Sequence, residues 1–207
     1  MRICRFREDE KEAYGVIQGE MVYRLIGTPY TEHDVGGLVG PLTAVKLVAP
    51  VTPSKILGVG PNYLGMADEV LLDHPRIFGR GPNTVIGPDD EIHLPAGMNV
   101  LVYEGELGVV IGRRTKMVSK EEVFENVMGY MLGNDVTSLE AMEADGGQLC
   151  RAKGFDTFYP CGPWVETDLD PEKVVINVTK NGVTHQGLSL ENSIFDISTL
   201  IAFISEA

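Results

Sequence analysis

The sequence predicts an α+β protein that is mostly β, with a few short helices and a small N-terminal β unit. Three observations predict this class. Short runs rich in Val, Ile, Tyr and Phe recur along the chain between Gly, Pro or charged turns. Asn181-Gly182 separates two alternating runs, which is a strong signal of a two-residue hairpin. Helix signals are confined to two short segments, residues 120–128 and 196–207.

The first 50 residues predict a small β-meander. Its strand-like runs cover residues 2–8, 13–19 and 21–27. Pro50 and Pro53 then interrupt the pattern, and proline cannot donate a hydrogen bond within a central strand. We therefore expect a β unit over residues 1–50, a connector, and a larger domain over residues 54–207.

The larger domain continues mainly as strands. Strand-like runs cover residues 55–60, 84–87, 91–95, 100–112, 129–136, 173–180 and 183–187. Ser119, followed three residues later by Glu122, forms a capping box ahead of apolar residues and predicts a helix over 120–128. A second helix is expected over 196–207, at the end of the chain.

Composition limits the partners and the compartment. The 207 residues are 43% hydrophobic, enough to bury a full core. A formal net charge of −13 argues against binding to nucleic acid or to an anionic membrane surface. The charged N-terminus has no signal-peptide apolar region, and no apolar run is long enough to span a bilayer. Three cysteines without C-x-x-C spacing support neither a disulfide framework nor a zinc knuckle, so we expect a cytoplasmic protein.

Two carboxylates stand in a segment with the composition of a strand, residues 102–110. Glu104 and Glu106 would share one face, with roughly 7 Å between their α-carbons. That face is either wet, which is ordinary in antiparallel sheets, or it lines a cavity, where two like charges require a cation or raise each other's pKa. Asp135 ends another strand-like run, although Asp is a poor strand former. Three oxygen ligands suit a hard cation such as Mg²⁺ better than zinc.

Three motifs of the larger domain follow one another in a specific order. They are YEGELGVVIGR at residues 103–113, GYMLGNDVTS at 129–138 and KGFDTFYPCGPWV at 153–165. This order resembles the catalytic domain of the fumarylacetoacetate hydrolase family, with its Y-E-x-E-L, N-D-V-T and K-x-F-D-T-F motifs. The resemblance runs from about residue 54 to the end. It implies the mixed β-sandwich roll of that family and a homodimer.

The resemblance also implies a metal site and a reaction class. Glu104, Glu106 and Asp135 match carboxylates that hold Mg²⁺ or Mn²⁺, with Ca²⁺ an occupant in crystals. The implied activity is decarboxylation or keto-enol isomerisation of a small 2-oxo (di)carboxylic acid in the catabolism of aromatic compounds. The alternatives are C–C hydrolysis of the acylpyruvate or fumarylacetoacetate type, and a catalytically silent member with a structural role.

Four further positions match functional residues of the family. Lys153 matches the lysine that binds and polarises the substrate, and Glu69 matches the acid that pairs with a histidine to activate water. Arg80 and Gln186 match substrate-binding positions, Arg80 in place of a lysine.

The chain departs from the family pattern at other positions. Met66 stands where the water-activating histidine is expected, and a thioether takes no proton at neutral pH. Leu139 and Met142 replace the usual Arg and Gln. The family normally continues with an L-x-P-G-D-x-I-x-T-G-T-P segment, which does not occur in this sequence, so the sequence is either incomplete or that of a shortened member. Because hydrolysis needs an activated water, Met66 favours decarboxylation or isomerisation.

Overall fold

The computed structural model describes residues 1–64 and 73–207, and of Gln186 it describes only the backbone. The strands are β1 Arg2–Glu8, β2 Lys11–Gln18, β3 Met21–Gly27, β4 His33–Pro41, β5 Leu47–Val48, β6 Ile56–Val59, β7 Ile77–Arg80, β8 Val85–Ile86, β9 Leu101–Val102, β10 Gly105–Ile111, β11 Val127–Asn134, β12 Thr137–Ser138, β13 Tyr159–Glu166, β14 Val175–Lys180 and β15 Val183–Ser189. The predominance of strands confirms the predicted α+β, mostly β class.

Helices are short, as expected. The α-helices are α1 Leu139–Ala144, α2 Leu149–Ala152 and α3 Ile197–Ser205, and the 3₁₀ turns are η1 Leu42–Ala44, η2 Pro82–Thr84, η3 Val123–Asn126, η4 Pro171–Lys173 and η5 Leu190–Asn192. Of these, the sequence predicted α3, whose first turn is capped by the Asp196 carboxylate accepting from the Thr199 amide at 2.6 Å. Within the described ranges, no helix is long and apolar enough to cross a membrane.

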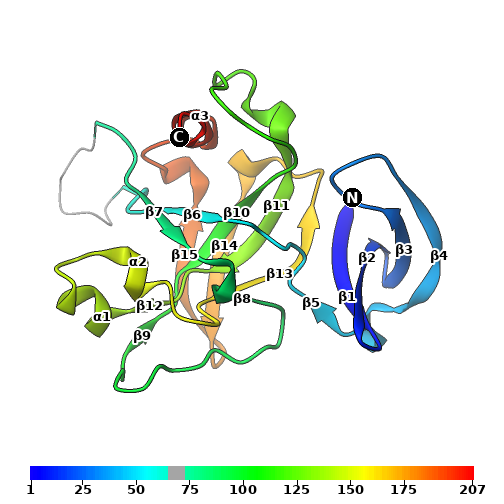
Figure 1. Ribbon diagram of the computed structural model, residues 1–207, viewed down its shortest axis with the longest axis horizontal. Coiled ribbons are helices and arrows are strands. Elements are labelled where there is room, and N and C mark those ends of the chain that lie inside the picture. Colours follow the sequence, from blue (N-terminus) through cyan, green and yellow to red (C-terminus); the bar gives the residue numbers. More distant parts are fainter. Residues whose placement is uncertain (65–72) are drawn as a thin grey trace.

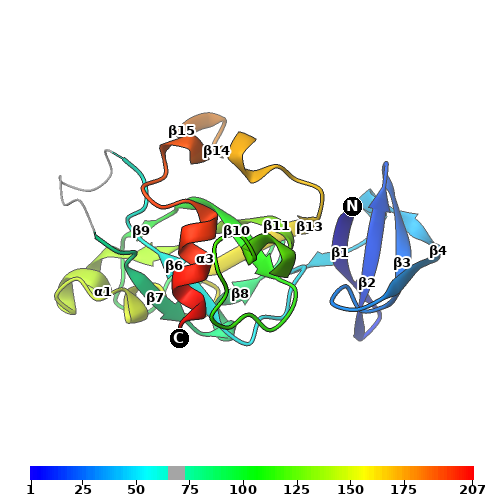
Figure 2. The same cartoon turned by 90° about the horizontal axis from the view of Figure 1, so that it is seen from above.

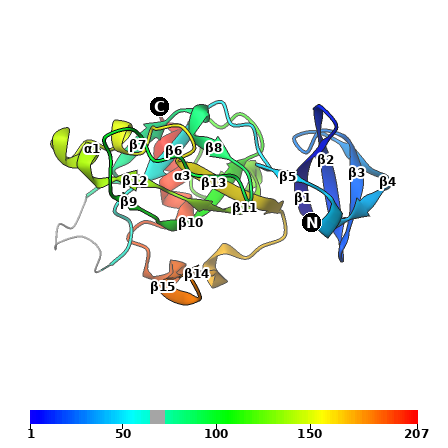
Figure 3. The same ribbon diagram turned by 90° about the horizontal axis from the view of Figure 1, so that it is seen from below.

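The N-terminal strands β1 to β4 form an antiparallel meander that stands at one side of the molecule (Figures 1 and 3). Its core contains Phe6 and Val22, which are almost completely buried. The sequence did not predict β4. Gly36, Gly37 and Gly40 interrupt its alternating pattern, and an edge strand with one neighbour tolerates such residues.

One sheet joins this unit to the rest of the chain. Its strand order is β10-β11-β13-β1-β2-β3-β4, with β5 added to β1 and β8 to β13. The join is the antiparallel pairing of β1 with β13, where Arg2 lies opposite Glu166. The buried Arg5 guanidinium also donates to the carbonyl of Ala49 at 2.8 Å, which fastens β1 to the connector. The boundary near residues 50–54 stays a prediction.

The hairpin predicted at Asn181-Gly182 is confirmed. β14 and β15 pair in an antiparallel sheet of their own, and the two turn residues have φ of 52° and 79°. Positive φ at both positions is the requirement of a type I′ turn. Figure 2 shows this hairpin above the main sheet and α3 in front of it.

Two predicted elements are wrong. The helix over 120–128 is only the short turn η3, although the Glu122 carboxylate does accept from the Ser119 amide at 3.0 Å. Val127 instead pairs with Ile111 and begins β11, so sheet pairing overrides the local helix signal. Residues 91–95 form no strand, because they belong to an irregular segment that runs from Gly87 to Val100.

Candidate functional site

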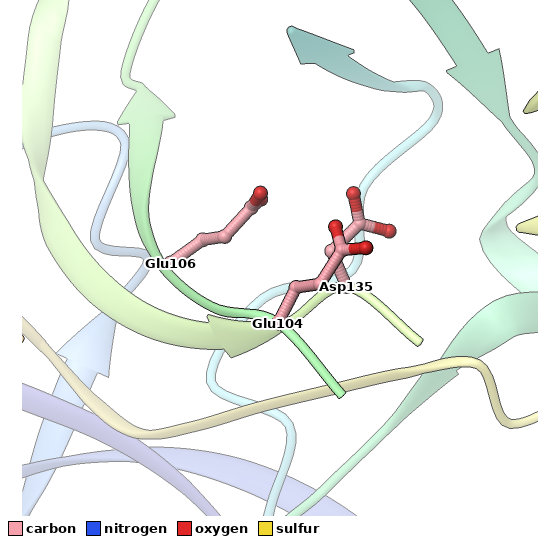
Figure 4. A group of neighbouring side chains, drawn as sticks. All are labelled: Glu104, Glu106 and Asp135. Atoms are coloured by element: carbon pink, nitrogen blue, oxygen red, sulfur yellow. The ribbon is translucent and has the colours of Figure 1, made fainter. Parts of the chain in front are cut away.

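The pairing of β10 with β11 brings Glu104 and Asp135 together. Gly105 lies opposite Asn134, so the residues just outside this pair, Glu104 and Asp135, become neighbours. The Asp135 amide donates to the Glu104 carbonyl at 2.8 Å, and the Asn134 side chain accepts from the Glu104 amide at 3.0 Å. Figure 4 shows the two carboxylates close together, with Glu106 reaching into the same space from β10.

The continuous strand predicted over residues 102–110 is interrupted in the structure. β9 ends at Val102 and β10 begins at Gly105, so Glu104 lies between two strands. The simple same-face spacing therefore does not position Glu104. The hydrogen bonds of its backbone to Asn134 and Asp135 do, and Figure 4 shows its side chain beside that of Asp135.

The three carboxylates are close enough to share a cation. One oxygen from each of Glu104, Glu106 and Asp135 lies within 4.8 Å of the other two. Oxygens on opposite sides of a Mg²⁺ ion are about 4.2 Å apart, and those around Ca²⁺ about 5 Å. The set thus offers three oxygen ligands within reach of one hard divalent cation, provided that the side chains close around it. Which residues bind a metal stays a prediction.

Two buried cations lie against these carboxylates. Lys153 follows α2 and is 4% exposed, and its Nζ lies 2.7 Å from Asp135 Oδ2 and 2.9 Å from Glu104 Oε2. Arg80 ends β7, and its guanidinium forms a buried ion pair with the other Asp135 oxygen. It also donates to the Phe158 carbonyl at 3.0 Å. The structure therefore brings two of the predicted substrate or catalytic residues to the three acids.

Aromatic rings hold both cations in place. Lys153 Nζ lies 5.2 Å from the centre of the Phe78 ring, and the Arg80 guanidinium lies 5.0 Å from the centre of the Tyr159 ring. Such cation–π contacts are strongest where water is excluded, as it is around these buried side chains. The sequence analysis did not identify Phe78 or Tyr159. Tyr159 directly follows the K-x-F-D-T-F motif, and this adjacency is the signal that could have identified it.

The three carboxylates differ in how closely a positive charge approaches them. Glu104 and Asp135 contact cations, but the Glu106 carboxylate forms no ion pair or hydrogen bond within the described part of the chain. The pKa of Glu106 is raised to about 7, mainly by burial; the Lys153 charge opposes this rise and the Glu104 charge adds to it. Burial also lowers the pKa of Lys153, which the nearby Glu104 carboxylate counteracts. Glu106 is thus the carboxylate that most lacks a positive partner.

These groups open into one cavity of about 810 Å³. Arg80, Glu106, Asp135 and Tyr159 line it near the carboxylates. From there it extends along β10 toward α3, where its walls are largely apolar. Glu106 therefore faces a cavity rather than a wet sheet face, the second of the two readings of the sequence, whereas the side chain of Glu104 is 39% exposed.

Several predicted residues are not placed here. Glu69 and Met66 fall in residues 65–72, outside the described residues, as does the side chain of Gln186. Leu139 and Met142 lie on α1. Two histidines contact aromatic rings instead of the carboxylates. His74 stacks on Phe203 and His185 packs edge-on against Tyr103.

The family comparisons agree with this site. Residues 55–207 match the model described as the fumarylacetoacetate (FAA) hydrolase C-terminal domain. Residues 1–50 match a second model, described as Rv2993c-like, N-terminal.

Relatives of known sequence or structure cover almost all of the chain. Protein Rv2993c of Mycobacterium tuberculosis is 36% identical over 99% of this chain and 82% of its own length. A 2,4-didehydro-3-deoxy-L-rhamnonate hydrolase of Sphingomonas sp. is 32% identical over 100% of this chain and 79% of its own. The crystal structure of a 5-carboxymethyl-2-hydroxymuconate delta-isomerase from Mycobacterium smegmatis is 36% identical and superposes with a TM-score of 0.92, over 100% of this chain and 83% of that one. With a family model matched over most of its length, this chain belongs to the fumarylacetoacetate hydrolase family.

Proposed function

We propose that this chain is a divalent-metal-dependent enzyme that decarboxylates or isomerises a small 2-oxo (di)carboxylic acid in the catabolism of aromatic compounds. The observation that carries the proposal is the convergence of Glu104, Glu106 and Asp135 with two buried cations, beside a cavity that Arg80, Glu106 and Asp135 line. A catalytically silent protein has no physical need to gather three like charges, because their mutual repulsion and burial destabilise the fold.

The charges favour an anionic ligand once the cation is bound. With all three carboxylates ionised, as they would be around a bound cation, they carry −3 and Lys153 and Arg80 carry +2, which leaves −1 before the cation is counted. A divalent cation would change this to +1, which matches a carboxylate that enters from solvent. Bound there, such an ion would act as a Lewis acid on the keto or enolate oxygen of the substrate.

Lys153 and Arg80 would stabilise the negative charge that develops on the substrate. Both are buried, so their charges act through a medium less polar than water. Decarboxylation and keto-enol isomerisation both develop negative charge on an enolate oxygen. A lysine Nζ and a guanidinium fixed by aromatic rings beside the carboxylates can stabilise that charge without first reorienting.

Hydrolysis is the second candidate, and the Sphingomonas relative, which is a hydrolase by name, favours it. C–C hydrolysis needs a base that activates water. Among the described residues, no histidine forms a hydrogen bond or ion pair with Glu104, Glu106 or Asp135. The expected histidine position is Met66, so Met66→His should add hydrolysis if hydrolysis is absent from the wild type.

One set of assays distinguishes the candidates. The protein is supplied with MgCl₂ or MnCl₂ and with three probes. These are 5-carboxymethyl-2-hydroxymuconate for isomerisation by ultraviolet absorbance, oxaloacetate for release of CO₂, and an acylpyruvate for release of pyruvate. We expect one of the first two reactions, abolished by EDTA and by Glu106→Gln but unaffected by Glu143→Gln, a change at an exposed glutamate.

Two outcomes would contradict the proposal. Pyruvate release from the acylpyruvate as the fastest reaction would make the protein a hydrolase. Absence of turnover of every probe, with metal still bound, would support the silent member.

A further inference from the structure

The side chain of Tyr159 crosses the sheet toward Glu106. It starts on β13, and its ring covers Gly133 of β11, where an added Cβ would lie only 2.7 Å from the ring atom Cζ. Its hydroxyl then reaches Gly108 of β10, 3.3 Å from the position of a Cβ there. Two glycines therefore make room for one tyrosine across three strands.

This path places the hydroxyl on the face of the sheet that carries Glu106. Gly108 is two residues from Glu106 in the same strand, so both point to the same face. Gly133 lies directly opposite Glu106 in the β10–β11 register, and directly opposed residues also share a face. The Tyr159 hydroxyl thus occupies the space that side chains beside Glu106 would otherwise fill.

The hydroxyl is free to bind a ligand. Tyr159 is 8% exposed and lines the cavity, yet its hydroxyl forms no hydrogen bond with any described residue. Buried hydroxyls normally have a partner, and one that faces a polar cavity finds it in a ligand or water. Burial raises the pKa of Tyr159 above its usual value, so the group remains a phenol and a hydrogen-bond donor.

Arg80 helps to hold the Tyr159 ring in place. The Arg80 guanidinium lies over it at 5.0 Å, and Arg80 is itself bound to Asp135 and to the Phe158 carbonyl. Movement of the ring would therefore disturb Arg80, and the hydroxyl is held in one position. A donor held in this way loses little conformational entropy when a ligand binds.

We propose that Tyr159 is a substrate-binding residue whose hydroxyl donates a hydrogen bond to an oxygen of the bound 2-oxo acid, while its ring positions Arg80. The inference rests on the proposed function and adds a polar contact beside Glu106. The Tyr159 hydroxyl would be a substrate contact in addition to those of the carboxylates, Lys153 and Arg80.

The test is Tyr159→Phe, which removes the hydroxyl and keeps the ring against Arg80 and the glycines. The probe is oxalate, a planar dianion that resembles the enolate of a 2-oxo acid, titrated by calorimetry into the full chain saturated with manganese. One hydrogen bond to a charged ligand predicts oxalate binding weaker by about tenfold or more. Manganese affinity and melting temperature should stay the same. Tyr130→Phe, a buried tyrosine of β11 outside the cavity lining, should leave oxalate binding unchanged.

A second variant tests the role of the ring. Tyr159→Leu should weaken oxalate binding further than Tyr159→Phe, because it also removes the support for Arg80. Equal oxalate binding by Tyr159→Phe and the wild type would overturn the inference alone. Loss of manganese as well as oxalate in Tyr159→Phe would overturn it too, since the hydroxyl would then serve Glu106 and not the substrate. A wild type that binds neither manganese nor oxalate would overturn the proposed function together with this inference.

Discussion

Glu106→Gln is predicted to change how the stability of the metal-free protein depends on pH. The pKa of Glu106 is about 7 in the folded state, against 4.5 for an unperturbed glutamate. Between these values the folded protein keeps a proton that the unfolded chain has lost. The free energy of unfolding therefore falls as pH rises through this window. The contribution is fully present below about pH 4.5 and lost as pH rises through about 7.

The magnitude follows from the size of the pKa shift. One pKa unit corresponds to about 1.4 kcal/mol, so a shift from 4.5 to about 7 amounts to about 3 kcal/mol. Between pH 5.0 and 7.5, about 2 kcal/mol of this should be lost. Glutamine is neutral at every pH and has nearly the shape of protonated glutamate. The stability advantage of Glu106→Gln over the wild type should therefore be about 2 kcal/mol larger at pH 7.5 than at pH 5.0, which corresponds to about 4–8 °C in melting temperature.

The assay is urea unfolding in EDTA at the two pH values, followed by the fluorescence of Trp164, the single tryptophan, on β13. Taking the difference between variant and wild type cancels the other titrating groups. Glu143→Gln, at an exposed site, should show no such difference. Saturating manganese should stabilise the wild type at pH 7.5 and leave Glu106→Gln nearly unaffected. A difference between variant and wild type that is the same at both pH values would refute the reasoning.

Three further predictions concern other parts of the molecule. Lys153→Met should lower the free energy of unfolding of the metal-free protein by about 3 kcal/mol, because it removes a buried cation from the buried carboxylate of Asp135. Denaturant unfolding measures this, and Lys173→Met at the surface should have no effect. Asp196→Ala should lower the free energy of unfolding by about 1 kcal/mol, because it removes the cap of α3. Asp196→Asn should retain most of the capping stability, as measured by thermal unfolding. We also predict a homodimer, because β4 forms an edge of the sheet and carries the exposed Leu38. Sedimentation at micromolar concentration should give a mass of twice 22.6 kDa. The mass of a single chain would contradict this prediction.

Local signals were sufficient where one short segment determines the structure. The turn at Asn181-Gly182 needs positive φ at two positions, and this pair of residues allows it. The first strands and α3 also follow from local patterns. The helix predicted over 120–128 failed because Val127 gains more from pairing with β10 than from a short helix, and this pairing is a long-range effect.

The candidate site depended on contacts between distant residues. Period-two spacing suggested that Glu104 and Glu106 were neighbours, but Glu104 is positioned by Asn134 and Asp135. The motif resemblance identified Arg80 and Lys153. Neither route could show that Tyr159 reaches β10, because its path depends on two glycines in other strands.

The central claim is that Glu104, Glu106 and Asp135 hold one divalent cation. Crystals grown with MnCl₂ and measured at the manganese absorption edge test it most directly. The account predicts a single strong anomalous peak bound by one carboxylate oxygen from each of the three residues, at about 2.0–2.6 Å. A site without a peak, in which Lys153 still joins Glu104 to Asp135, would contradict it.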